Sequence, residues 1–248
     1  MTAGCYLLLL LDLLLLLPVP ALRRRGRNAI YHLWSRLCVR ILGGRLRIEG
    51  EPPKAPFFLV SNHLSYVDIV VLASCLDGFF VAKLEIRGWP LFGMLSRTVG
   101  TLFVDRELRR DVVRVNKLIE GVLDQGYGII LFPEGTSTQG YEVAHFHSPL
   151  LDYPARRGMP VHLAALHYRT SPRDVPAHLS VSWWGDAGFG AHASQFLGVR
   201  SFEATLRFSP RTVQSSDRKE LAEAARQAVI EIFEPVVDPA ARATDHGL

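Results

Sequence analysis

The chain has 248 residues, of which 48% are hydrophobic and 21% are charged, enough for one sizeable folded domain with a packed core. Its three cysteines, Cys5, Cys38 and Cys75, stand far apart and form no CxxC pair. This spacing argues against a disulfide framework and a zinc site, and it is typical of a reducing compartment.

The net charge of +4 is unevenly distributed along the chain. Residues 1–48 contain eight arginines and one acid, Asp12, and so carry +7, which leaves −3 for the other 200 residues. The basicity belongs to one segment, so the charge gives no reason to expect binding to nucleic acid. No stretch resembles a nucleic-acid-binding module.

Residues 1–44 are predicted to associate with a membrane. Residues 6–17 form an apolar run that Asp12 interrupts and Pro18 ends, which is shorter than the ~20 apolar residues of a full span. A signal peptide is the alternative, because residues 19–21 (VPA) resemble a small-residue cleavage site. No Lys or Arg precedes the run, however, and the arginines that follow it favour a cytoplasmic location for the rest of the chain.

The next stretch predicts an amphipathic helix. Its apolar residues recur at helical spacing and form one stripe, made of Ile30, Leu33, Trp34, Leu37 and Ile41. One interpretation is a helix packed on the main domain. Because the stretch follows an apolar run and contains no acid, we instead expect it to lie on the surface of an anionic membrane.

From about residue 45 to residue 235 the chain alternates short apolar runs with amphipathic stretches. This alternation predicts a single α/β domain with a mostly central mixed sheet flanked by helices. The expected strands are 57–60, 79–83, 101–105, 128–132, 161–167, 179–184 and 204–208. The clearest expected helices are 111–124 and 217–233, and residues 236–248 are predicted to form a tail.

Unusual polar residues directly follow three of the expected strands. These groups are Asn62-His63, Asp105-Arg106 and Pro133-Glu134-Gly135-Thr136. In open α/β sheets, ligand sites gather at the carboxyl ends of the strands. If the three strands are parallel and adjacent, their polar groups meet in one crevice.

The stretch 61–68, SNHLSYVD, allows two interpretations. Ser65 and Asp68 match a capping box, so a helix that begins at Ser65 needs no catalytic role for His63 in the preceding loop. If the chain folds back at this cap, Asp68 can meet His63. Asp68 would then fix the tautomer of His63 and leave its other ring nitrogen free to take a proton. His63 would then be a general base for a substrate hydroxyl. Both interpretations can hold together.

Several common catalytic arrangements are missing from the sequence. It has no GxSxG elbow, no reactive cysteine beside the histidine and no HExxH pair. A histidine base without a protein nucleophile indicates that the hydroxyl of the substrate itself is activated, for direct transfer to an alcohol or to water. His145 and His147 form an HxH pair, but no third ligand is nearby in the sequence, so we expect no metal site.

The other two polar groups could bind an anion. Arg106 could hold a phosphate through a bidentate contact, or be a surface arginine paired with Asp105. Gly135 lets backbone N–H groups and the Thr136 hydroxyl face an anion or an oxyanion, although a plain tight turn is the alternative. Because Glu134 would repel a bare phosphate, we expect it to contact an acceptor hydroxyl or to order a basic neighbour such as Arg106.

Taken together, these groups resemble the motifs of the glycerolipid (lysophospholipid) acyltransferase family. The resembling blocks occur in the family's order: Asn62-His63 with Asp68 (NHxxxxD), residues 100–106 (GTLFVDR, for GxxFxxR), residues 132–136 (FPEGT) and Pro160-Val161. Lys83-Leu84-Glu85, with Pro90 and Gly93, is similar to the stretch between the first two blocks. The resemblance covers roughly residues 45–235.

The resemblance implies transfer of an acyl chain from acyl-CoA or acyl-carrier protein to a lysolipid hydroxyl. His63 would be the base and Asp68 its orienting partner, with no metal, no cofactor and no covalent acyl-enzyme. The expected substrate-binding residues are Asn62, Lys83, Arg106, Glu134, Gly135 and Thr136. The expected location is the inner (cytoplasmic) membrane, with the catalytic domain on the cytoplasmic side and the membrane surface as a partner.

The expected acceptor is 1-acylglycerol-3-phosphate, which would give phosphatidic acid. Residues 81–93 (VAKLEIRGWPLFG) also resemble members that acylate lyso-ornithine lipid, and Phe146-His147-Ser148 stands where related sequences often have Phe-Lys-Ser. Lyso-ornithine lipid is therefore the alternative acceptor. Outside this class, the alternatives are a membrane-associated thioester or ester hydrolase, in which His63 activates water, and a catalytically silent membrane-binding protein.

Overall fold

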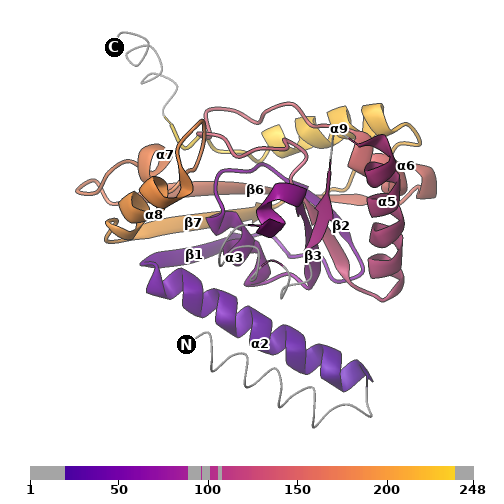
Figure 1. Cartoon of the computed structure of the whole chain (residues 1–248), viewed down its shortest axis with the longest axis horizontal. Helices are drawn as coiled ribbons and strands as arrows, with labels where there is room; N and C mark the ends of the chain where they lie inside the picture. Colours follow the sequence, from indigo (N-terminus) through magenta and orange to yellow (C-terminus); the bar gives the residue numbers. More distant parts are fainter. Residues whose placement is uncertain (1–19, 89–95, 97–100, 106–107, 238–248) are drawn as a thin grey trace.

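The computed structural model describes residues 20–88, 96, 101–105 and 108–237 (Figure 1). Its centre is a seven-stranded sheet with the strand order β1-β7-β6-β2-β5-β3-β4. The strands are β1 (Gly44–Glu49), β2 (Phe58–Ser61), β3 (Gly78–Lys83), β4 (Leu102–Val104), β5 (Gly128–Leu131), β6 (Val161–Thr170) and β7 (Phe202–Phe208). The five strands from β6 to β4 are parallel, and β7 is antiparallel to β6. The predicted α/β domain with a mixed sheet is confirmed.

Helices cover both faces of the sheet (Figure 1). They are α2 (Pro20–Ile41), α3 (Val67–Ala73), α5 (Arg109–Asp124), α6 (Asp152–Arg157), α7 (Ala177–Ser180), α8 (Phe189–Leu197) and α9 (Arg218–Ile230), with 3-10 turns η1 (Leu84–Gly88) and η2 (Pro149–Leu151). One core cluster lies between the sheet and α5, α6 and α9. The other lies between the sheet and α2, α3, α7 and α8.

The central strands β2 and β5 are buried along their whole length. Successive side chains of a strand point to opposite faces, and so Phe58 and Val60 enter one core cluster while Leu59 enters the other. A strand covered on both faces needs a continuous apolar run, as in the FFLV and GIILF stretches. The polar residues that follow these strands are therefore held at one edge of a rigid sheet.

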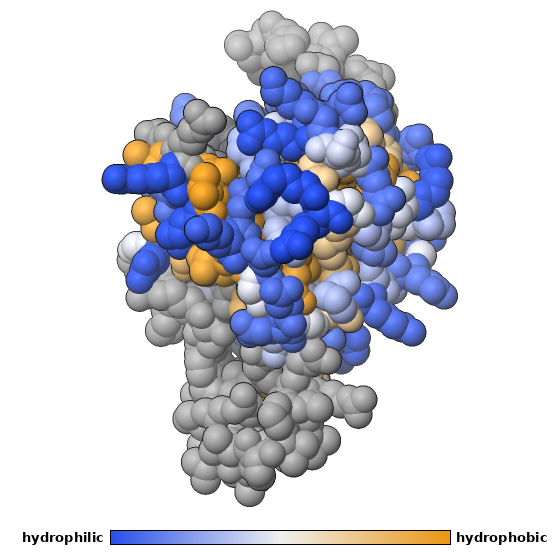
Figure 2. All heavy atoms as spheres, turned by 90° about the vertical axis from the view of Figure 1, so that its right-hand side faces the viewer, coloured by the Kyte–Doolittle hydropathy of each residue, from blue (hydrophilic) through white to orange (hydrophobic). Residues whose placement is uncertain are grey.

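The two long helices on the same face confirm the amphipathic pattern of the sequence. In α5, Val115, Ile119 and Val122 are buried at helical spacing, and the opposite side faces water. In α9, the Asp217 carboxylate caps the first turn by accepting hydrogen bonds from the main-chain N–H groups of residues 219 and 220. Seen from the side of α5 and α6, the surface is mainly hydrophilic with smaller hydrophobic patches (Figure 2).

The predicted strand at 179–184 is wrong. The chain instead forms the short helix α7 and a loop, because Pro176 precedes it and the Ser180 hydroxyl donates to the carbonyl oxygens of residues 175 and 176. The indole N–H groups of Trp183 and Trp184 donate to main-chain carbonyls of residues 187 and 178. Trp183 and Trp184, although aromatic residues are typical of strands, therefore stabilise a loop. Strand β1 and helix α8 are elements that the sequence analysis did not predict.

Helix α2 packs on the domain, and its most buried residues are not those of the predicted apolar stripe. Ser35 and Val39 are buried against α3, and Arg36 donates from Nε to the main-chain oxygen of Ser74 at 3.0 Å. Of the stripe residues, Leu33 is 53% exposed and Ile41 is 66% exposed. The helix is therefore packed on the domain, as one interpretation predicted, and part of its apolar stripe still faces outward.

Among the described residues, no helix combines the length and the hydropathy that a membrane span requires. Residues 1–19 lie outside the described part of the chain, so the predicted anchor in this segment stays a prediction.

Near the C-terminus, Val236 donates from its main-chain N–H to Gly140 O at 2.8 Å and Val237 is buried, so the first two residues of the predicted tail pack on the domain. Residues 238–248 of the predicted tail also lie outside the described part.

Candidate active site

Residues 62–66, named here the histidine turn, leave the carboxyl end of β2 and lead into α3. Asn62, the first residue of the turn, is 1% exposed. Its Nδ2 donates to Leu166 O at 3.0 Å, and Leu166 N donates to its Oδ1 at 2.7 Å, so the side chain joins β2 to β6. The sequence predicted a substrate contact for Asn62. These bonds give the amide a positioning role, and a contact of Asn62 with substrate stays a prediction.

His63 and Asp68 meet as the fold-back interpretation predicted. His63 Nδ1 lies 2.7 Å from Asp68 Oδ2, and the Asp68 side chain is fully buried. The same Oδ2 accepts hydrogen bonds from Leu64 N at 2.7 Å and Ser65 N at 3.1 Å. The Ser65 bond is the returning half of a capping box, although α3 begins at Val67 rather than at Ser65. The contacts that both interpretations of SNHLSYVD require are therefore present, and the role of His63 as a base stays a prediction.

The imidazole of His63 has a fixed plane and a fixed tautomer. Its ring stacks on Phe132 with centroids 4.1 Å apart and planes 13° apart. Because Nδ1 faces a carboxylate, Nδ1 carries the proton in the neutral ring and Nε2 is left as the proton acceptor. No hydrogen-bond partner of Nε2 occurs within the described residues, and the side chain is 21% exposed. The free nitrogen can thus receive a proton from a ligand.

Residues 132–136, named here the glutamate turn, follow β5, the parallel neighbour of β2. Gly135 has φ +79°, a conformation that favours glycine. Its N–H donates to Phe132 O at 3.2 Å, and the expected contacts of Gly135 and Thr136 with substrate stay predictions. Thr136 is exposed. Further along the loop, Thr138 N donates to His63 O at 2.9 Å and holds the two turns together.

Glu134 lies beside the histidine turn and is 4% exposed. Burial raises the pKa of its carboxyl group to about 8, and the nearby Asp68 charge adds to the rise. The main-chain N–H groups of His63 and Ala144 and the Arg226 charge oppose it, but neither carboxyl oxygen has a hydrogen bond of good geometry within the described residues. A contact of Glu134 with an acceptor hydroxyl stays a prediction. At neutral pH the carboxyl is largely uncharged.

Two predicted cationic contacts belong to strands further along the sheet. Lys83 is exposed at the carboxyl end of β3, which lies between β5 and β4. Asp105 follows β4 and donates from its main-chain N–H to Asp111 Oδ2 at 2.7 Å, whereas Arg106 lies outside the described residues. The carboxyl ends of β2, β5, β3 and β4 therefore lie at one edge of the sheet. Strand β3 separates Asp105, which follows β4, from the glutamate turn, which follows β5. The roles of Lys83 and Arg106 stay predictions.

Two contacts at the site had no signal in the sequence. Tyr168, on β6, donates its hydroxyl to Asp68 Oδ1 at 2.6 Å. Tyr66, in the histidine turn, contacts His192 Nδ1 of α8 through its hydroxyl at 3.2 Å, and His192 Nε2 lies 2.9 Å from Ser182 O. A tyrosine in an apolar strand is most simply interpreted as a core residue, so only the fold shows that Tyr168 reaches the carboxylate.

The loop 181–187 packs beside the histidine turn. Trp183 N donates to Leu64 O at 2.8 Å, and the Ser137 hydroxyl donates to Trp183 O. The Trp183 ring lies edge-on to Tyr66, with centroids 5.8 Å apart. The connection between β6 and β7 is thus attached to the histidine turn and to Ser137, the residue that follows the glutamate turn.

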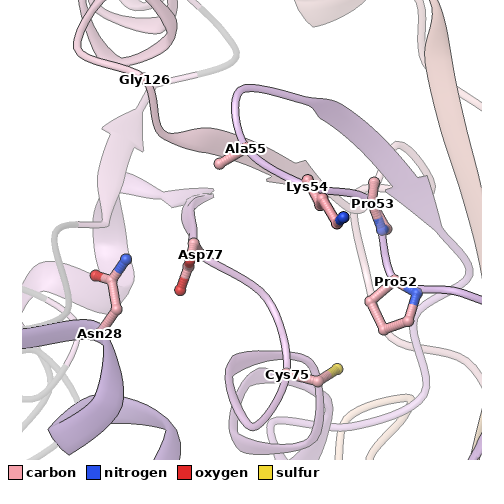
Figure 3. A pocket seen from close by; sticks show the side chains of 8 residues that line it. All are labelled: Asn28, Pro52, Pro53, Lys54, Ala55, Cys75, Asp77 and Gly126. Atoms are coloured by element: carbon pink, nitrogen blue, oxygen red, sulfur yellow. The ribbon is translucent and has the colours of Figure 1, made fainter. Parts of the chain in front are cut away.

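No group of three or more His, Cys, Asp or Glu side chains within the described residues is placed to hold a metal ion. A polar pocket of about 270 Å³ lies elsewhere, before the amino ends of β2, β3 and β5 (Figure 3). It is lined by Asn28, Pro52, Pro53, Lys54, Ala55, Cys75, Asp77 and Gly126. Burial raises the pKa of the Cys75 thiol to about 11, so this group is a poor nucleophile. The pocket lies away from the histidine turn.

Comparison with known proteins places the chain among acyltransferases. A protein-family model described as "Acyltransferase" matches residues 45–162. A lyso-ornithine lipid O-acyltransferase from Pseudomonas aeruginosa is 34% identical over 205 residues, which cover 82% of this chain and 78% of that protein. A 1-acyl-sn-glycerol-3-phosphate acyltransferase from Neisseria gonorrhoeae is 31% identical over 125 residues, covering 50% of this chain and 49% of that protein.

The fold has a counterpart among solved structures. The crystal structure of the 1-acyl-sn-glycerophosphate acyltransferase from Thermotoga maritima matches with a TM-score of 0.59 and 21% identity, covering 85% of this chain and 81% of that one.

The family model and the sequence relatives show that the chain belongs to the lysophospholipid acyltransferase family and is an acyltransferase. The family resemblance in the motifs around His63, Glu134 and residues 100–106 is confirmed.

Proposed function

We propose that this enzyme moves a fatty acyl chain from acyl-CoA or acyl-carrier protein to the free hydroxyl of a lysolipid, with His63 as general base. The observation that carries the proposal is the 2.7 Å contact of His63 Nδ1 with Asp68. It leaves Nε2 as a proton acceptor at the edge of the sheet where parallel α/β folds bind their ligands.

The proposed reaction needs no protein nucleophile. His63 Nε2 takes the proton of the acceptor hydroxyl while that oxygen attacks the thioester carbonyl carbon. That attack forms the C–O bond of the new ester. The tetrahedral intermediate then collapses, which restores the C=O bond and breaks the C–S bond, and the leaving thiolate takes the proton back from the imidazolium. The buried carboxylate of Asp68 stabilises that imidazolium through Nδ1.

Two acceptors are candidates within this proposal. Relatives named lyso-ornithine lipid O-acyltransferase match 81–86% of the chain at 31–34% identity. Relatives named 1-acyl-sn-glycerol-3-phosphate acyltransferase match 50–73% of it at 27–31% identity. The longer matches at equal or higher identity support lyso-ornithine lipid as the acceptor, ahead of the 1-acylglycerol-3-phosphate expected from the sequence. The two acceptors share the free hydroxyl that His63 would deprotonate, and they differ in the head group.

We also propose that the enzyme works on the cytoplasmic face of the membrane. Leu33 and Ile41 of α2 are exposed beside the exposed arginines Arg36 and Arg40. An apolar stripe flanked by cations is the pattern of helices that lie on anionic lipid. The buried side of the same helix contacts α3, so lipid binding would place the histidine turn close to the bilayer.

An acyl-transfer assay tests the proposal. Purified enzyme in detergent receives labelled acyl-CoA or acyl-carrier protein with lyso-ornithine lipid, with 1-acylglycerol-3-phosphate, or with no acceptor. We expect labelled product with lyso-ornithine lipid in preference to the phosphate lipid, and little free fatty acid without an acceptor. Rapid release of free fatty acid without an acceptor would instead identify a hydrolase that uses His63 to activate water.

A further inference from the structure

The histidine turn is held on both sides of His63 by the same strand. Asn62 exchanges two hydrogen bonds with the main chain of Leu166 on β6. Two residues further along β6, Tyr168 donates its hydroxyl to Asp68 Oδ1 at 2.6 Å. Leu166 and Tyr168 lie on the same face of the strand. Strand β6 therefore sets the positions of the residues one before and five after the histidine.

The donors to the Asp68 carboxylate differ in origin. Oδ2 accepts from His63 Nδ1 and from the main-chain N–H groups of Leu64 and Ser65, all of which belong to the turn and move with it. Oδ1 accepts from Tyr168, which belongs to the sheet. Among the hydrogen bonds of the described residues, the Tyr168 bond is thus the one that ties the carboxylate to the rigid part of the domain.

The surroundings of Tyr168 allow its ring little freedom. The residue is 1% exposed, and its ring packs edge-on against Phe202 of β7 with centroids 6.0 Å apart. A buried phenol needs a partner for its hydroxyl, and here the partner is a buried carboxylate. Such a charge-assisted bond is stronger than one between neutral groups.

We propose that Tyr168 is a positioning residue for acyl transfer, because its hydroxyl fixes the rotation of the Asp68 carboxylate and keeps Oδ2 in line with His63 Nδ1. The inference rests on the proposed role of His63 as the base. Without the hydroxyl, the carboxylate can rotate away from Nδ1, and the imidazolium that forms on His63 during transfer is then stabilised less.

The first test is Tyr168→Phe, which keeps the ring and removes the hydroxyl. We expect kcat to fall by about tenfold with KM for both substrates little changed, the pattern of an interaction that matters in the transition state. Tyr153→Phe is the matched control, because Tyr153 is a buried tyrosine of α6 in the other core cluster. It should leave kcat unchanged.

The second test shows whether Tyr168 acts through Asp68. In the Asp68→Ala background, Tyr168→Phe should cause no further loss of kcat, because its hydroxyl then has no carboxylate to position. A further tenfold loss in that background would overturn the inference, and so would a single Tyr168→Phe variant with the kcat of the wild type. Because rates are divided by the folded fraction measured by circular dichroism, a change in stability alone does not mimic the effect.

The His63→Ala variant separates this inference from the proposed function. If His63→Ala keeps full transferase activity, the proposed base is wrong and the role of Tyr168 falls with it. If His63→Ala is inactive and Tyr168→Phe behaves as the wild type, only the inference about Tyr168 is overturned.

Discussion

His63 and Asp68 are five residues apart in the sequence, yet their side chains meet at 2.7 Å between Nδ1 and Oδ2. Five positions of a regular helix would turn the two side chains roughly 140° apart. They meet because His63 precedes α3, whereas Asp68 lies in its first turn and accepts hydrogen bonds from the main chain of Leu64 and Ser65. The helix cap is thus the means by which the contact between His63 and Asp68 forms.

Replacing Asp68 with asparagine should separate charge from geometry. The amide oxygen can take the place of Oδ2 and still accept from Leu64 N, Ser65 N and His63 Nδ1. The negative charge that stabilises the imidazolium is lost, and so we expect kcat to fall roughly 100-fold or more while the fold is kept. Steady-state kinetics and a thermal melt measure the two effects. A variant with wild-type kcat would show that the charge of Asp68 has no role in turnover.

Glu134→Gln should change how stability depends on pH. In the folded protein, burial raises the pKa of the carboxyl group to about 8 from its ordinary value of 4.5. Between these values folding therefore takes up a proton, and the wild type loses about 1.4 kcal/mol of stability per pH unit as pH rises through the window. Glutamine does not titrate, so the Glu134→Gln variant does not lose stability in this way. We therefore expect its free energy of unfolding to increase relative to that of the wild type as pH rises from about 5 to 8.

Urea denaturation at several pH values measures that difference. Other titrating groups contribute to both proteins and largely cancel in the comparison. Parallel pH–stability curves for the two proteins would contradict the raised pKa of Glu134.

Gly135→Ala should destabilise the protein because φ at this position is +79°. An L residue in that conformation costs roughly 1–2 kcal/mol, and the strain would fall on the glutamate turn that follows β5. Gly121→Ala is the matched control. Gly121 lies inside α5, and an added Cβ meets nothing within 4 Å, so alanine should raise stability by about 0.5–1 kcal/mol. Melting temperatures that shift in the same direction for both variants would contradict the assignment of Gly135.

The exposed stripe of α2 should bind lipid. We expect the double variant Leu33→Ser with Ile41→Ser to bind anionic vesicles clearly more weakly in a sedimentation assay, because both side chains are more than half exposed and would enter the bilayer. Leu197→Ser, at the end of α8, is the control, since this leucine is 71% exposed on a different part of the surface. Equal binding by both variants and the wild type would locate membrane binding elsewhere in the chain.

The sequence was sufficient to predict the central sheet, because β2 and β5 are buried on both faces and therefore need continuous apolar runs. It was also sufficient to place His63 and Asp68 together, because a capping box is a local pattern. The loop around Trp183 was mispredicted because strand propensity ignores the local hydrogen bonds that close α7. Tyr168 could not be predicted, since its contact with Asp68 spans 100 residues and depends on β6 lying beside β2.

Helix α2 was predicted correctly as a helix, but the residues that it buries were not. Its apolar spacing predicted a helix, and the helix is present. The face that packs on α3 contains Ser35 and the buried Val39, together with the main-chain contact of Arg36. Hydropathy alone does not single out such a face, because small and polar side chains can also be buried where they fit or find partners.

The most direct test of the central claim is the acyl-transfer rate of His63→Ala with lyso-ornithine lipid and a labelled acyl thioester. Removing a general base costs about 10²- to 10⁴-fold, so we expect transfer to fall at least 100-fold while the circular dichroism spectrum stays that of the wild type. A His63→Ala enzyme that transfers the acyl chain at the wild-type rate would contradict the account.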